Sequence, residues 1–192
     1  ISWLKRGGDR PFFLLVFLID PHAPYRPLKA QRMFLDEVAP GEVNRQPFRE
    51  YATPLPRDEH DRIVAAYDGE GHSADAETAR IVEFLRANDL LQRTTVAITA
   101  DHGEAFDDHG CYQHGYHMWE SVLRVPFLLM SPRVPAKGVY DDRPYTHVDI
   151  APTLLDLAGV EYDGDELPGR NIAAALGDPG LDRYRAIFSQ YN

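Results

Sequence analysis

Eight consecutive apolar residues, Phe12 to Ile19, constrain the fold of this chain more than any other segment. A run without a polar interruption suits a strand that is covered on both faces, as in a parallel sheet. The run is too short to span a bilayer, and Pro21 and Pro24 end regular structure directly after it. It therefore predicts a buried strand in a sheet that carries helices on both faces.

Further segments continue an alternation of strands and helices. Residues 95–99 and 125–130 are predicted strands. Helical spacing begins at Asp58, a second helix is expected after an N-cap at Asp75, and residues 149–159 are typical of a short helix with a C-terminal glycine cap. This order predicts an α/β architecture with a mainly parallel sheet. Residues 40–57 are expected to form a long irregular loop, and residues 186–189 a last strand.

Length and composition exclude some classes of protein. The chain has 192 residues, enough for one domain with a substantial core. Its net charge of −10 argues against general binding to nucleic acid or to anionic membranes. An anionic substrate would then need a local positive site made by a metal, Arg, Lys or His. Cys111 is the one cysteine, so an internal disulfide is excluded, while compartment and oligomeric state stay open.

The segment from Thr99 to Glu104 carries the chemistry that stands out first. It reads Thr-Ala-Asp-His-Gly-Glu and follows a predicted strand, so Asp101 and His102 come to the carboxyl edge of the sheet. Open α/β sheets bind ligands at this edge. Asp and His are both metal ligands, and glycine lets the backbone turn beside them. His22 also follows an apolar run, and we expect it at the same edge.

Five segments with recognisable residues occur in a fixed order. They are Asp-Pro-His-Ala-Pro-Tyr at 20–25, Tyr-Asp-Gly-Glu at 67–70, Thr-Ala-Asp-His-Gly-Glu at 99–104, His-Gly-Tyr-His-Met-Trp-Glu-Ser-Val-Leu-Arg-Val-Pro at 114–126 and His-Val-Asp-Ile-Ala-Pro-Thr-Leu-Leu-Asp-Leu-Ala-Gly at 147–159. Together they resemble the sulfatase family of the alkaline phosphatase superfamily, from Pro11 to about Ile172. The resemblance implies an alkaline-phosphatase-like α/β sandwich, with a mainly parallel central sheet and helices on both faces. Residues 1–192 would form a single partial catalytic domain whose N-terminal part is missing.

The resemblance also implies roles for particular residues. Asp101 and His102 match a pair of metal ligands, with calcium the first expectation and manganese or zinc the alternatives. His22 matches an active-site histidine that donates a hydrogen bond to the ester or protonates the leaving group. His114 matches a position at which a His, or a nearby Lys, faces the bound anion. Glu104 is expected to support the metal loop from behind.

One part of the family pattern is not found. Sulfatases carry a Cys or Ser, oxidised to formylglycine, in a Cys/Ser-x-Pro-x-Arg segment. Cys111 is followed by Tyr-Gln-His-Gly, and Ser131-Pro132-Arg133 has the wrong spacing. We therefore expect the chain to be the C-terminal part of a sulfatase-like domain, with formylglycine and the first metal-binding segment upstream. The isolated chain is expected to be inactive.

Three functions remain open at this point. The first is a metal-dependent hydrolase of sulfate esters, acting on a small-molecule or saccharide sulfate or phosphate ester. The second is a phosphonate or phosphodiester hydrolase, or a phosphoethanolamine-type transferase, of the same superfamily. The third is a non-catalytic sulfatase-like binding module. No nucleic-acid partner and no membrane span are expected. The other histidines are expected at the surface or in local packing: His60, His72, His109, His117 and His147.

Overall fold

The structure, a computed structural model, describes residues 1–7, 10–27, 33–34, 55–115, 117–134, 138, 141–176, 187 and 189. The chain divides into two compact units, and each is described by itself. The first comprises Ile1–Ala87 and His102–Arg124, and the second comprises Asn88–Asp101 and Val125–Asn192. The strand expected at 186–189 and most of the loop expected at 40–57 lie outside the described residues. That residues 1–192 form one catalytic domain stays a prediction.

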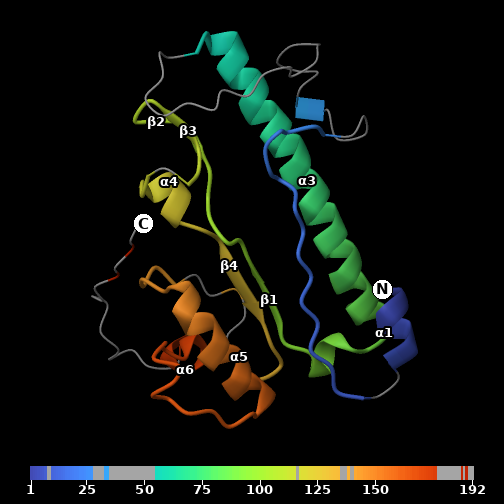
Figure 1. Cartoon of the computed structure of the whole chain (residues 1–192). Coiled ribbons are helices and arrows are strands. Elements are labelled where there is room, and N and C mark those ends of the chain that lie inside the picture. Colours follow the sequence, from blue (N-terminus) through green and yellow to red (C-terminus); the bar gives the residue numbers. More distant parts are fainter. Residues whose placement is uncertain are drawn as a thin grey trace. The chain divides into compact units, whose positions relative to one another are not determined.

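The longest element of the first unit is helix α3, Arg57–Ala87 (Figure 1). Asp58 and Glu59 lie in its first turn and Arg86 in its last, which complements the helix dipole at both ends. The separate helix predicted after Asp75 is wrong, because α3 continues through this region without a break. Gly69 and Glu70 are buried there, so packing outweighs the low helix propensity of glycine.

The core of the first unit forms where the segment after the first apolar run meets α3. Tyr25 is buried together with Ile63, Ala66 and Tyr112, and Phe106 packs against this group. The Glu70 carboxylate of α3 accepts a hydrogen bond from the backbone N–H of Arg26. Burial raises the pKa of Glu70, while the N–H groups of Arg26 and His22 lower it. The helix therefore holds residues 22–26 by apolar packing and by a carboxylate.

A β-hairpin completes the first unit. Strand β2, Ala105–Asp108, pairs antiparallel with β3, Cys111–Gln113 (Figure 1). The register is irregular between Phe106 and Asp108, where Asp107 adopts a positive φ of 68°. The turn at His109 and Gly110 also has positive φ at both residues, as tight hairpin turns require. Two short helices, α1, Ser2–Gly7, and α4, Glu120–Leu123, also belong to the first unit.

The second unit contains the other predicted strands. Strand β1, Val96–Thr99, pairs with β4, Phe127–Met130, in the register Val96↔Met130 to Thr99↔Phe127 (Figure 1). Both strands are confirmed, but their pairing is antiparallel. The parallel pairing that we expected is not found among the described strands, since the two sheets that they form are both antiparallel pairs. Helix α5, Ile150–Ala158, contacts α6, Ile172–Leu176, in the same unit.

The apolar run at 12–19 is not the buried strand that we predicted. Residues 11–20 form neither helix nor strand, and Phe13 and Leu15 are 81% and 78% exposed. A strand needs a hydrogen-bonded neighbour, and the described sheets pair only β1 with β4 and β2 with β3. Without such a neighbour the run stays outside both sheets and leaves its side chains uncovered.

A buried carboxylate organises the start of α5. Asp149 is fully buried and accepts hydrogen bonds from the backbone N–H groups of Thr146, at 2.8 Å, and Arg170, at 2.6 Å. Thr146 and Asp149 form a capping box. The helix ends at Gly159, whose φ of 72° is left-handed, so the C-terminal cap predicted from the sequence is confirmed.

We expect the 192-residue chain to self-associate through the exposed run at 12–19, because an uncovered apolar extended segment is a site for strand pairing. Replacing Phe13 and Phe17 by Glu should lower the associated fraction, measured by light scattering after size-exclusion chromatography. The matched control carries Ala76→Glu and Ala79→Glu, two exposed positions on α3. Equal effects of the two pairs, or a monomeric wild-type chain, would contradict this expectation.

Asp149→Ala should lower the free energy of unfolding by about 2–3 kcal/mol, because it leaves two backbone N–H groups without their charged acceptor. Urea denaturation followed by circular dichroism measures this change. Asp156→Ala removes an exposed carboxylate from the same helix and serves as the control, with an expected change within about 0.5 kcal/mol. A loss of similar size in both variants would show that the buried hydrogen bonds are not responsible.

Candidate active site

Three histidine rings gather in the first unit, and all three were selected from the sequence. The rings of His102 and His114 lie face to face, with centroids 3.8 Å apart and an angle of 32° between their planes. The ring of His22 meets that of His114 edge-on, at 5.6 Å between centroids. His22 is exposed, while His102 and His114 are partly buried. Residues 22, 102 and 114 are thus brought to one place by the fold.

Two of these rings are oriented by the carbonyl group of the next residue. Nδ1 of His22 lies 2.7 Å from the oxygen of Ala23, and Nδ1 of His102 lies 2.8 Å from the oxygen of Gly103. A carbonyl oxygen only accepts, so the ring nitrogen must donate in both cases. In a neutral ring the lone pair then lies on Nε2, which is the nitrogen that a metal or a proton would meet.

The third ring is oriented by a carboxylate. Nδ1 of His114 lies 2.9 Å from Oε1 of Glu104, and the hydroxyl of Tyr25 donates to Oε2 of Glu104 at 2.6 Å. The Glu104 side chain is 5% exposed, and Tyr25 is 2% exposed. Burial and the neighbouring Glu104 raise the pKa of Tyr25, so its hydroxyl stays a donor. Both oxygens of this buried carboxylate therefore have partners.

The loop between Asp101 and β2 tolerates only glycine at position 103. The backbone N–H of Gly103 donates to the oxygen of Val122 at 2.7 Å. A Cβ atom at this position would lie 2.1 Å from the backbone oxygen of Ser121, which is far inside van der Waals contact. The close approach of the loop to α4 thus explains the glycine of the Asp-His-Gly motif, beside His102.

Asp101 is exposed and is the last residue of its segment in the second unit. An imidazole with its lone pair on Nε2 and a neighbouring carboxylate fit a divalent cation in their chemistry. Within the described residues, however, no three His, Cys, Asp or Glu side chains are grouped so that they could hold a metal ion. That Asp101 and His102 bind a metal stays a prediction.

The remaining histidines differ in part from our expectations. His60 is not simply a surface residue, since its Nδ1 lies 2.9 Å from the hydroxyl of the buried Tyr112. His109 stacks on Trp119 with centroids 4.0 Å apart. Both ring nitrogens of His117 are buried, and among the described residues neither has a hydrogen-bond partner. His147 is exposed, and its Nε2 lies 2.8 Å from the oxygen of Ala100, 47 residues earlier in the chain, so the expectation of local packing is wrong.

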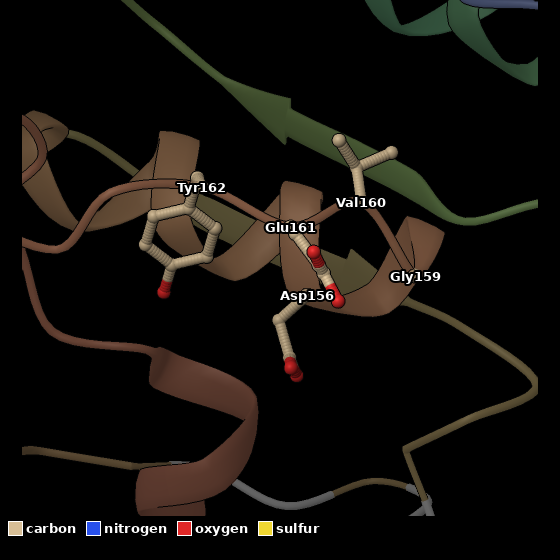
Figure 2. A pocket seen from close by; sticks show the side chains of 5 residues that line it. All are labelled: Asp156, Gly159, Val160, Glu161 and Tyr162. Atoms are coloured by element: carbon tan, nitrogen blue, oxygen red, sulfur yellow. The ribbon is translucent and has the colours of Figure 1, made fainter.

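A pocket in the second unit involves none of the residues predicted for the site. Figure 2 shows its lining at the end of α5, formed by Asp156, Gly159, Val160, Glu161 and Tyr162. Two of the five lining residues carry carboxylates, and none carries an imidazole or a guanidinium. Such a lining repels an anionic ester, so we do not place the reaction there.

Comparison with known proteins identifies the family. The model of the family described as Sulfatase matches residues 1–160. This chain belongs to the sulfatase family. It is 28% identical over 186 residues to the uncharacterized sulfatase YidJ of Escherichia coli strain K12, which covers 91% of this chain and 37% of that protein. The chain therefore spans little more than a third of the length of this relative.

Solved structures support the same assignment and place the fold among alkaline-phosphatase-like α/β proteins. The phosphonate monoester hydrolase SpPMH from Silicibacter pomeroyi is 26% identical, with a TM-score of 0.59 over 69% of this chain and 26% of that chain. BT4656, solved with its substrate D-glucosamine-2-N,6-O-disulfate, is 25% identical, with a TM-score of 0.58 over 66% of this chain and 26% of that chain. In the described part of our chain, every helix is too short or too polar to cross a bilayer.

Calcium should bind to the 192-residue chain weakly or not at all, because the ion takes about six to eight oxygen ligands and this chain offers Asp101 beside one imidazole. Isothermal titration calorimetry with calcium measures this, with Asp101→Asn as the comparison variant. Tight stoichiometric binding that disappears in Asp101→Asn would show that the chain supplies the other ligands itself.

Proposed function

We propose that the protein acts as a hydrolase of sulfate esters through His22 and His114. One observation carries the proposal: three imidazoles converge within the first unit of a chain whose net charge is −10. Imidazoles supply the local hydrogen-bond donors and positive charge that an anionic ester needs in an acidic protein. The membership of the chain in the sulfatase family supports this assignment.

The two proposed catalytic side chains use the same ring atom. Nδ1 of His22 is engaged by the carbonyl of Ala23, and Nδ1 of His114 by Glu104. Nε2 of each ring is therefore the atom proposed to meet the ester. In its protonated form, His22 would donate a hydrogen bond to the leaving-group oxygen or protonate it. His114 would bind an oxygen of the sulfate group and orient the ester.

Asp101 and His102 are proposed to hold a divalent metal together with ligands from outside this chain. When bound, such an ion neutralises negative charge on the sulfate group. Calcium is our first choice, followed by manganese and zinc. The nucleophile is also proposed to lie outside the 192 residues, as a formylglycine, because no Cys or Ser here has the required Pro-x-Arg setting. His102 and His114 are in ring contact, so metal and anion would be neighbours.

Two specific findings refine the choice of substrate. The solved relative BT4656 was determined with a glucosamine disulfate as substrate, which supports a sulfated saccharide for this protein as well. The similarity to a phosphonate monoester hydrolase favours hydrolysis of phosphonate or phosphodiester bonds as the second candidate. Both esters present anionic oxygens to the same imidazoles, so the geometry in this chain is compatible with either.

The full-length product of the gene should hydrolyse 4-nitrophenyl sulfate in the presence of calcium, and His22→Ala should lower kcat by about a hundredfold or more. His72→Ala, which removes an exposed histidine from α3, is the matched control and should leave the rate unchanged. The 192-residue chain alone should be inactive. Release of 4-nitrophenol at 405 nm, a standard wavelength for this product, measures all four proteins.

The same assay separates the candidate functions. Faster turnover of 4-nitrophenyl phenylphosphonate than of the sulfate would establish the second candidate in place of the first. Absence of turnover on both esters, together with binding of a sulfated saccharide, would favour a non-catalytic binding module. Robust activity of the 192-residue chain that depends on His22 would overturn the proposed location of the nucleophile.

A further inference from the structure

We propose that Glu104 is a positioning residue that determines which nitrogen of His114 faces the ester. This inference rests on the proposed function, because it assigns His114 a substrate to face. From the sequence we had expected Glu104 to support the metal loop. The described contacts connect Glu104 to His114 and to Tyr25, through one carboxylate oxygen each.

The register of the hairpin places Glu104 opposite His114. Ala105 pairs with Gln113 in the last pair of the ladder, and Glu104 and His114 are the next residue on each side of this pair. This alignment depends on the extra residue between Phe106 and Asp108. Without it, counting from the pair of Asp108 and Cys111, His114 would lie opposite Ala105. A bulge re-aims side chains in this way at many functional sites.

Tyr25 prevents the carboxylate from turning away. Its hydroxyl donates to Oε2 of Glu104 at 2.6 Å, while its ring is buried in the core beside Ile63 and Ala66 of α3. A side chain held in a packed core cannot follow a mobile partner. The hydrogen bond from Tyr25 therefore holds Oε2 of Glu104 in place. The other oxygen, Oε1, accepts the Nδ1–H of His114.

This arrangement determines the hydrogen-bonding pattern of His114. Nδ1 must carry a proton to donate to the carboxylate, and this holds for the neutral ring as well as for the charged one. Nε2 is then the nitrogen that is turned to the substrate, and in the protonated ring its N–H donates a hydrogen bond to an oxygen of the sulfate group. A histidine held in one tautomer by a buried carboxylate is a known means of orienting a catalytic imidazole. The carboxylate itself is 5% exposed, so it is largely shielded from the anion that it would repel.

The tautomer of His114 can be measured without any assay of activity. In the full-length protein labelled with [15N]histidine, long-range 1H–15N correlation distinguishes a proton on Nδ1 from one on Nε2, and it is recorded at a pH at which the signals of His114 are those of the neutral ring. We expect His114, assigned by the loss of its signals in His114→Gln, to carry its proton on Nδ1. Glu104→Met keeps the length of the side chain and removes both acceptors, so the proton should move largely to Nε2. Glu104→Gln keeps one acceptor oxygen and should preserve Nδ1–H.

Kinetics then test the consequence for the reaction. Glu104→Met should lower kcat/KM at least about tenfold, because the ring of His114 loses the acceptor that orients it towards the ester, and Glu104→Gln should recover most of this loss. Glu77→Met makes the same substitution on the exposed face of α3 and should change neither the rate nor the tautomer. A role of Glu104 in packing alone would predict equal rates for the Met and Gln variants and an unchanged tautomer in both.

The outcomes distinguish this inference from the proposed function. A proton on Nε2 of His114 in the wild-type protein, or an unchanged tautomer in Glu104→Met, overturns the positioning role whatever the activity. A tautomer that depends on Glu104 in a protein that cleaves neither sulfate nor phosphonate esters overturns the proposed function and the catalytic part of the inference, while the orientation of His114 by Glu104 stands.

Discussion

The carboxylate of Glu104 is the interaction on which the first unit depends. It joins Tyr25, 79 positions earlier in the chain, to His114, ten positions later. Through Tyr25 it is connected to the packing against α3, and through its place before β2 to the register of the hairpin. Burying a carboxylate costs free energy unless both of its oxygens accept hydrogen bonds. The segments that carry Tyr25, Glu104 and His114 therefore stabilise one another.

The second unit uses the same physical device for a structural purpose. Asp149 is fully buried and accepts from the backbone of Thr146 and of Arg170, which ties the start of α5 to a segment twenty-one residues later. The oxygens of Asp149 accept hydrogen bonds from backbone N–H groups. One oxygen of Glu104 instead contacts the imidazole of His114, a side chain that can take part in a reaction. The difference in partner, more than the difference in burial, separates a cap from a candidate site.

The exposed run at 12–19 shows how strongly a strand depends on its neighbours. Its composition is that of a central strand, yet its side chains are uncovered because neither described sheet includes it. The strands β1 and β4 formed where expected, since each has the other as a partner. The hydrophobicity of a segment predicts that burial would stabilise it. Whether the segment is buried as a strand depends on a neighbouring strand with which it can pair.

Local patterns in the sequence determined the elements whose causes are local. The cap of α5 at Gly159, the strands at 96–99 and 127–130, and the choice of residues 22, 102 and 114 all followed from neighbouring residues or from family motifs. Tertiary structure alone decided that α3 runs on past Asp75, that His60 meets Tyr112, and that Glu104 meets His114. These contacts depend on burial and on a bulged register that no short stretch of sequence specifies. The sequence did contain a signal for the contact between Glu104 and His114, namely Glu and His separated by nine residues, on either side of a turn with glycine. The extra residue in β2 is nevertheless needed to bring the two side chains opposite each other.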